Sequence, residues 1–162
     1  MRKLLVTALF VVSVLGQSWA QAPAPTFQLT GNRLALPSPV GFRPGTAELL
    51  PTSEYALQHI KQYLETKTYI SQLRIEGHVA EGTAGQALSE KRAAAVTNWL
   101  AAHGVDCHRL LPVGFGSTKP VAAANTEANT RIEVVNVALR GHVIGGLPTD
   151  GGGKVAGAPC QP

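Results

Sequence analysis

Several residues of the types used in metal binding lie close together in this 162-residue chain. His78 and Glu81 are spaced as His-x-x-Glu, and His103 and His108 flank Cys107. A catalytic zinc site needs three protein ligands on rigid elements, and a helix with a His-x-x-x-His pair is the usual sign of one. No such pair is present. We therefore expect neither a metal site nor a cofactor, and we interpret His78 as a strand residue with its ring hydrogen-bonded near the next loop.

Nucleophilic catalysis has one candidate, Ser117, in the run Gly114-Phe115-Gly116-Ser117. The run lacks the strand-turn-helix setting of a nucleophile elbow, and no helix is expected after it, which also excludes a dinucleotide fingerprint. The sequence therefore predicts a turn here and a protein that is not an enzyme.

Residues 1–20 have the features of a secretory signal peptide. Arg2 and Lys3 supply the positive start, residues 4–15 are an apolar run broken by one Thr and one Ser, and Ser18-Trp19-Ala20 is a small-x-small cleavage site. The run of about 12 residues is shorter than the roughly 20 that span a bilayer. We expect cleavage after Ala20, or otherwise after Ala22, and no transmembrane span in the mature chain. A membrane anchor that stays is the alternative.

The charge of the chain favours no nucleic-acid partner. The formal net charge of +4 falls to +2 when Arg2 and Lys3 leave with the signal, and no basic stripe remains. A nucleic-acid-binding function is therefore not expected.

Export also decides how the two cysteines are interpreted. Thiols are oxidised beyond the cytoplasm, so Cys107 and Cys160 are expected to form one disulfide that ties the C-terminal segment to the domain. Two free thiols, or a Cys160 that bonds to another chain, are the alternatives.

Composition divides the rest of the chain into three parts. Residues 21–33 are a linker with two prolines and no sustained period. Residues 34–140 alternate between strand and helix periods and are expected to form the domain. Residues 141–162 are rich in Gly and Pro and are expected to be a mobile tail unless Cys160 ties them down.

The domain is predicted to contain four strands and two helices. Their order is strand 34–42, helix 53–66 capped by Thr52 or Ser53, strand 70–78, a helix from a Ser89 cap to Gly104, strand 110–113 and strand 131–139. This order predicts an α+β fold, a β-α-β-α-β-β sandwich with both helices packed on one face of a mixed sheet.

Four motifs occur in one order within this domain. They are Ile75-Glu76-Gly77-His78, Leu88-Ser89-Glu90-Lys91-Arg92-Ala93, Val113-Gly114-Phe115-Gly116 with Lys119-Pro120, and Asn129-Thr130-Arg131-Ile132-Glu133-Val134. Together they resemble the OmpA-like domain, the peptidoglycan-associating module of outer-membrane proteins. The resemblance implies a non-enzymatic, periplasmic cell-envelope protein, associated with the outer membrane only indirectly.

In the family, the domain binds the peptide stem of peptidoglycan, commonly at diaminopimelate. An Asp at a strand end accepts from the ligand ammonium, and an Arg in the first turn of the next helix binds the carboxylate. The resemblance assigns the Arg to Arg92. The Asp is missing, because the family's Gly-His-Thr-Asp reads Gly77-His78-Val79-Ala80 here. Loss of such a partner lowers affinity by roughly tenfold to a hundredfold.

Three further residues are assigned to the same site by the resemblance. Glu81 is the candidate to replace the missing Asp, with a solvated loop charge as the alternative. Arg131 lines the groove or pairs with a carboxylate on the sheet, and His78 lies at the strand end. Arg92 binds an anion or is a helix-surface cation. The competing hypothesis is a scaffold that has lost the ligand and contacts another envelope protein.

Overall fold

The computed structural model describes residues 25–80, 85–123, 127–157 and 160. The predicted signal peptide, the first part of the linker and Glu81 lie outside these residues. Within the described part of the chain, neither helix is both long and apolar enough to cross a bilayer.

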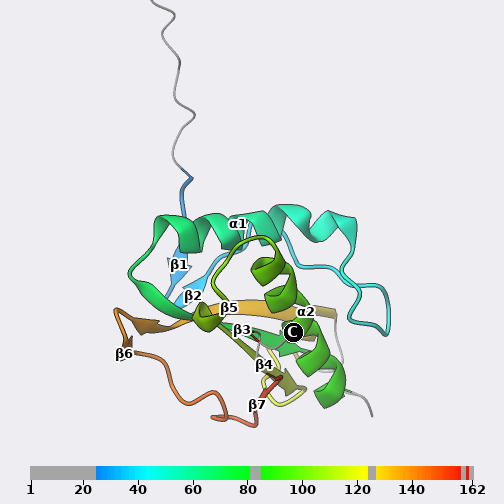
Figure 1. Cartoon of the computed structure of the whole chain (residues 1–162). Helices are drawn as coiled ribbons and strands as arrows, with labels where there is room; N and C mark the ends of the chain where they lie inside the picture. The colour runs from blue at the N-terminus through cyan, green and yellow to red at the C-terminus, as the bar shows by residue number, and fades with distance from the viewer. Residues whose placement is uncertain (1–24, 81–84, 124–126, 158–159, 161–162) are drawn as a thin grey trace, which may run out of the picture.

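A seven-stranded mixed sheet forms the middle of the molecule (Figure 1). β3 and β4 are parallel, and the other pairs are antiparallel. The spatial order is β1-β2-β5-β3-β4-β7, with β6 paired to β5. The strands are β1 Leu29–Thr30, β2 Arg33–Leu34, β3 Ile70–His78, β4 Leu110–Gly116, β5 Arg131–Leu139, β6 His142–Val143 and β7 Lys154–Val155.

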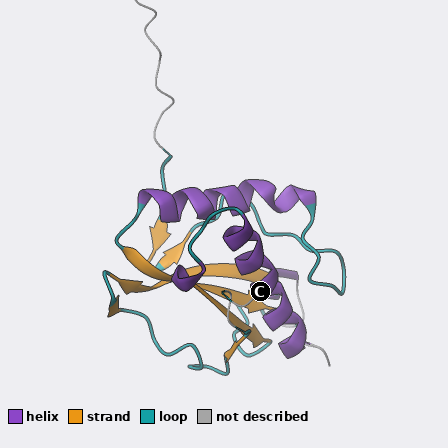
Figure 2. Ribbon diagram, in the orientation of Figure 1, coloured by secondary structure: helices purple, strands orange, loops and turns teal. Residues whose placement is uncertain are grey.

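Two helices, α1 Glu54–Thr66 and α2 Gly85–Ala102, pack on one face of this sheet (Figure 2). Short 3-10 turns lie at Pro51–Ser53, Cys107–Arg109 and Glu127–Asn129. The helices and the sheet share one apolar core, because residues at helical spacing in α1 and α2 face alternate residues of β3 and β5. This confirms the predicted α+β fold. Its central residues are Leu57, Ile60, Leu64, Leu73, Ile75, Ala93, Val96, Leu100 and Val134.

The start of α2 differs from the prediction. The helix begins at Gly85, so Ser89 lies inside it and is not its N-cap. The Ser89 hydroxyl donates to Gln86 O at 2.7 Å and accepts from Gly116 N at 2.9 Å, which fastens the helix to β4. A Cβ at Gly77 would lie 2.2 Å from Ser89 O, so this close approach requires a glycine in β3. At the other end Gly104, with φ +91°, follows the helix as predicted.

The first predicted strand is also wrong beyond its first residue. Only Leu34 of residues 34–42 belongs to β2, and Phe42 makes an isolated bridge to Leu49. Pro37 and Pro39 interrupt the pairing because they carry no N–H to donate. Ser53 does precede α1, but its hydroxyl makes no cap and instead bonds to both the N–H and C=O of Gly41.

The sheet extends beyond residues 34–140 at both ends. β1 and part of β2 fall in the predicted linker, and β6 and β7 fall in the predicted tail. Cys107 and Cys160 form the expected disulfide. The segment between β6 and β7 crosses the sheet face that the helices leave free, where Arg74 Nη1 donates to Gly146 O at 3.0 Å. Residues 142–157 are thus held by strand pairing as well as by the cross-link.

Candidate functional site

Arg92 is buried at the end of the second turn of α2, with 6% of its surface exposed. Its Nε donates to Thr46 O at 2.8 Å, and its guanidinium lies 4.8 Å from the centre of the Phe42 ring. Burial lowers the pKa of Arg92 from its ordinary value. Because α2 begins at Gly85, the prediction that Arg92 lies in the first turn is wrong, and the helix dipole does not explain its partner. The chain from Phe42 to Thr46 holds the side chain in place instead.

A groove of about 370 Å³ lies beside Arg92. One wall is the loop at Gly45, Thr46 and Ala47, and the other is the start of α2 at Ala87, Leu88 and Lys91. We call the cavity lined by these six residues the Arg92 groove, after the neighbouring Arg92, which follows Lys91 and donates to Thr46 O. Among the described residues, only Thr46 O accepts a hydrogen bond from the Arg92 guanidinium, and it does so from Nε. The N–H groups on Nη1 and Nη2 of Arg92 can therefore donate to a ligand.

The residues that follow β3, Val79 and Ala80, include no acidic side chain. Ala80 N donates to Thr130 Oγ1 at 3.0 Å, which ties the end of the β3 segment to the start of β5. The Ala80 side chain has no acceptor for a ligand ammonium. Glu81, the predicted replacement, lies outside the described residues, and its role stays a prediction.

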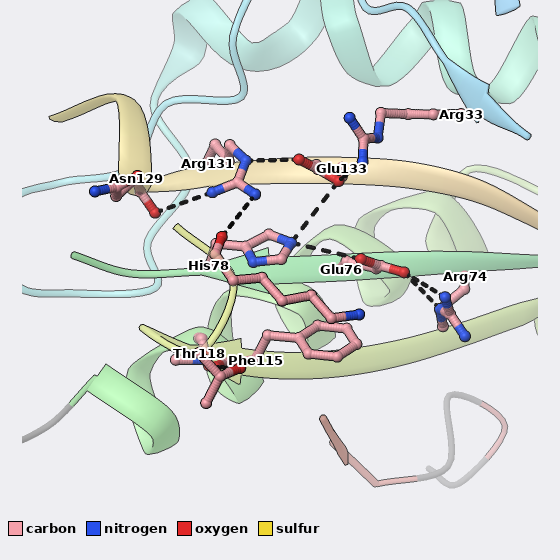
Figure 3. Close-up of polar contacts among 12 residues, drawn as sticks. Arg33, Arg74, Glu76, His78, Phe115, Thr118, Asn129, Arg131 and Glu133 are labelled. Atoms are coloured by element: carbon pink, nitrogen blue, oxygen red, sulfur yellow. Dashed lines mark hydrogen bonds and ion pairs between the residues drawn. The ribbon is translucent and has the colours of Figure 1, made fainter. Parts of the chain in front are cut away.

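His78 and Arg131 lie on the opposite face of the sheet from the core. Figure 3 shows them together with Glu76 and Glu133, which have the same orientation on β3 and β5. Arg131 Nε donates to Glu133 Oε1 at 2.6 Å. Of the two expectations for Arg131, the structure therefore agrees with pairing to a carboxylate on the sheet. The structure therefore does not bring Arg131 or His78 into the Arg92 groove, whose lining residues include neither.

The charged side chains on this face form one network, which we call the charged cluster and which is buried or partly buried except at Arg33. Arg74 bonds to Glu76 Oε1 through Nε at 2.7 Å and Nη2 at 2.6 Å. Arg33 Nη2 lies 2.8 Å from Glu133 Oε2. Burial acts to raise the pKa of Glu76, but neighbouring His78, Arg74 and Lys119 outweigh it and lower that pKa below its ordinary value. The members are Arg33, Arg74, Glu76, His78, Arg131 and Glu133.

The His78 ring is 1% exposed and stacks on Phe115, with ring centres 5.3 Å apart and planes 8° apart. Neither ring nitrogen has a hydrogen-bond partner among the described residues, which corrects the expectation of a hydrogen-bonded ring. Nε2 lies 3.5 Å from Glu76 Oε2 and 4.0 Å from Glu133 Oε2 (Figure 3). Stacking on Phe115, rather than a hydrogen bond near the loop, fixes this ring.

Two groups of side chains have the spacing of metal ligands. Glu76, His78 and Glu133 place ligand atoms within 4.8 Å of one another, as do Cys107, His108 and Cys160. In the first group both carboxylates are already neutralised by guanidinium groups, which repel a cation. In the second group the two sulfurs are joined in a disulfide and are not thiolates. Neither donor set fits a metal ion.

The sequence interpretation missed the charged cluster, although a signal for it exists. Strand alternation places Arg74, Glu76 and His78 on one face of β3, and Arg131 and Glu133 on one face of β5. Pairing these two alternations would have predicted the cluster. The participation of Arg33 had no signal, because residues 21–33 have no strand period.

The sequence profile of the OmpA family matches residues 41–133, which is more than half of the chain. Domains of this family are periplasmic, non-catalytic domains of the cell envelope that bind peptidoglycan. No curated protein matches the chain at a significant level.

Solved structures give the same fold. The peptidoglycan-associated lipoprotein of Burkholderia pseudomallei is 31% identical, with a TM-score of 0.52, over 59% of this chain and 86% of that one. An outer-membrane protein of Borrelia burgdorferi is 26% identical, with a TM-score of 0.54, over 68% and 95%. The OmpA-like domain of FopA1 from Francisella tularensis is 21% identical, with a TM-score of 0.53, over 67% and 75%, and supports the fold alone.

Proposed function

The chain belongs to the OmpA family, and we propose that it associates non-covalently with the peptide stem of peptidoglycan through the Arg92 groove. The observation that carries this proposal is Arg92 itself, which donates to Thr46 O, lies over the Phe42 ring and follows Lys91 in the chain. Thr46 and Lys91 both line the groove, and the two terminal nitrogens of Arg92 bond to no other described residue. A guanidinium in this state suits a carboxylate, which it binds with two parallel hydrogen bonds.

The ligand of this groove is the zwitterionic end of diaminopimelate in the stem peptide. Arg92 binds its carboxylate, and Lys91, which lines the groove and is exposed, adds positive charge nearby. Glu81 accepts from the ligand ammonium in place of the Asp that Ala80 replaces. His78 and Arg131 take no part, because they lie on the other face of the sheet. The protein acts in the periplasm after its signal peptide is removed.

Cosedimentation with purified peptidoglycan sacculi tests this proposal. The purified protein should be retained above a control protein, and Arg92→Gln should lower retention roughly tenfold or more because it removes a charge-assisted hydrogen bond. Arg92 also packs on Phe42, so thermal unfolding must show that the variant is folded. Lys91→Gln, at an exposed residue of the same groove, should weaken retention with no loss of stability. Absence of retention by the wild type would rule the proposal out.

A second candidate function follows from Ala80. Without an acidic residue at this position, the domain is a scaffold that has lost its ligand and binds another envelope protein. Ala80→Asp distinguishes the two candidates. A large gain in sacculus retention from a wild-type level near background favours the scaffold, whereas a small gain on clear wild-type retention favours the wall-binding function.

A further inference from the structure

A second concave site lies on the helix-free face of the sheet, over the charged cluster. The cavity has a volume of about 600 Å³ and is enclosed by the β1–β2 turn, by β3 and β5, and by residues 119–121. This volume is within the range of small-ligand sites, roughly 300 to 1,000 Å³. None of the residues that line the Arg92 groove line this cavity.

The charged side chains of the cavity wall are predominantly basic. The four cations Arg33, Arg74, Lys119 and Arg131 face only two carboxylates, Glu76 and Glu133. The cavity therefore carries an excess charge of +2. Arg74, Glu76 and Glu133 are each more than nine-tenths buried, so this charge is poorly screened by water. A concave surface of this kind concentrates anions.

Two of the cations have hydrogen-bond donors to spare. The Lys119 ammonium lies over the Phe115 ring at 3.8 Å from its centre, and no carboxylate of the described residues pairs with it. Arg33 is half exposed, at 53% of its side chain, and only its Nη2 bonds to a described residue, Glu133. Arg74 and Arg131, in contrast, are committed to Glu76, Glu133 and backbone carbonyls.

We propose that this cavity binds a phosphomonoester dianion, with Arg33 and Lys119 as its direct ligands. A phosphomonoester carries about −1.5 to −2 charges at pH 7 and three strong acceptor oxygens, which match the excess of +2 and the spare donors of both cations. A monocarboxylate would leave one positive charge uncompensated. Arg131 and Glu133 are positioning residues: their bond at 2.6 Å holds Glu133 where it orients Arg33.

Titration of the purified full chain with inorganic phosphate, followed by calorimetry or NMR, tests the proposal. The wild type should bind saturably, and Arg33→Gln and Lys119→Gln should each weaken binding by roughly tenfold or more. Added NaCl should weaken it further because salt screens partly exposed cations. Lys61→Gln is the matched control: Lys61 pairs with Glu65 at 2.7 Å on α1, and its removal should leave the affinity unchanged.

Two further arms identify the source of the phosphate. Soluble glycerol phosphate represents a small metabolite, and vesicles containing phosphatidic acid represent a lipid headgroup. Binding of either, abolished by Arg33→Gln, supports the site and names its source. The two glutamine variants alter different segments, so thermal unfolding of both guards against a folding defect in one. No saturable phosphate binding by the folded wild type, or equal affinity in the wild type and both variants, would overturn the proposal.

Discussion

The two faces of the central sheet are both buried, but by different means. On the helix side Leu73, Ile75 and Val134 are fully buried in an apolar core closed by α1 and α2. On the other side Arg74, Glu76 and Glu133 alternate with them along the same strands, at 4–7% exposure. They are covered by the C-terminal segment and the β1–β2 turn. The alternation of apolar and charged residues along these strands therefore gives the sheet two buried faces. One is stabilised by apolar packing, and the other by ion pairs beneath the C-terminal segment, which the disulfide cross-links to the domain.

The two proposed binding sites also lie on different faces. The helix side presents the Arg92 groove at the edge of its core, and the helix-free side presents the basic cavity over its ion pairs. The two interiors should also respond differently to mutation. In the apolar core the loss of stability grows with the number of methyl groups removed, whereas on the charged face the loss of one carboxylate leaves a buried charge without its partner.

The largest effect should come from the disulfide. Cys107→Ser with Cys160→Ser removes a cross-link between residues 53 apart and should lower the free energy of unfolding by up to about 4 kcal/mol. Hydrogen exchange should show loss of protection at the amides of Ile144 and Ala156, which bond to Val137 and Pro112, with α1 and α2 still the most protected. Equal loss of protection on both faces would mean that the C-terminal segment does not unfold separately from the helices.

Glu133→Gln tests the ion pairs. It removes the carboxylate that neutralises Arg33 and Arg131, and the free energy of unfolding in urea should fall by about 3 kcal/mol because a partly buried guanidinium is left unpaired. A loss below about 1 kcal/mol, the range of a surface ion pair, would show that this face is open to water.

The matched change on the helix side is Ile75→Val, one residue from Glu76 in β3 and fully buried. Removal of one methyl group should cost about 1 kcal/mol in the same urea experiment, because the transfer and cavity terms for a single methyl are small. The contrast between the faces fails if this variant is less stable than Glu133→Gln.

The smallest effect should appear in the pH dependence. The pKa of Glu76 is lower in the fold than in the unfolded chain, so its contribution is complete above about pH 4.3 and is lost as the pH falls through the folded value. Glu76→Gln should therefore flatten the fall in stability below that pH. If stability falls equally with pH in the variant and the wild type, Glu76 does not contribute to the stability of the charged face through its lowered pKa.

The regular elements could be predicted from the sequence because their periods are strong. α1, β3 and β5 lie at or within one residue of their expected ranges. The start of α2 could not be predicted in this way. Ser89 is a residue type that often caps a helix, but here its hydroxyl accepts a hydrogen bond from Gly116 N on β4. The C-terminal segment is too rich in glycine to have a period, and its order comes from long-range pairing and the disulfide.

For the site, the sequence was informative about residue types and strand alternation, but the family motifs did not separate residues that lie on opposite faces of the sheet. The role of Arg92 stays a prediction, and its contacts had no local signal, because Thr46 and Phe42, which hold it, precede it by more than 40 positions. Arg131 and His78 belong to the same family motifs but face the opposite side. Alternation along each strand separates these residues from the apolar positions of the core, but which residue of β3 lies beside which residue of β5 depends on the register between the strands.

The most direct test of the division between the two faces is calorimetric titration of a diaminopimelate-containing stem peptide into three proteins. The wild type should bind saturably, Arg92→Gln should bind roughly tenfold or more weakly, and Arg33→Gln, on the opposite face, should bind as the wild type does. Unchanged binding by a folded Arg92→Gln variant, or loss of binding by Arg33→Gln, would contradict the assignment of peptidoglycan recognition to the helix side.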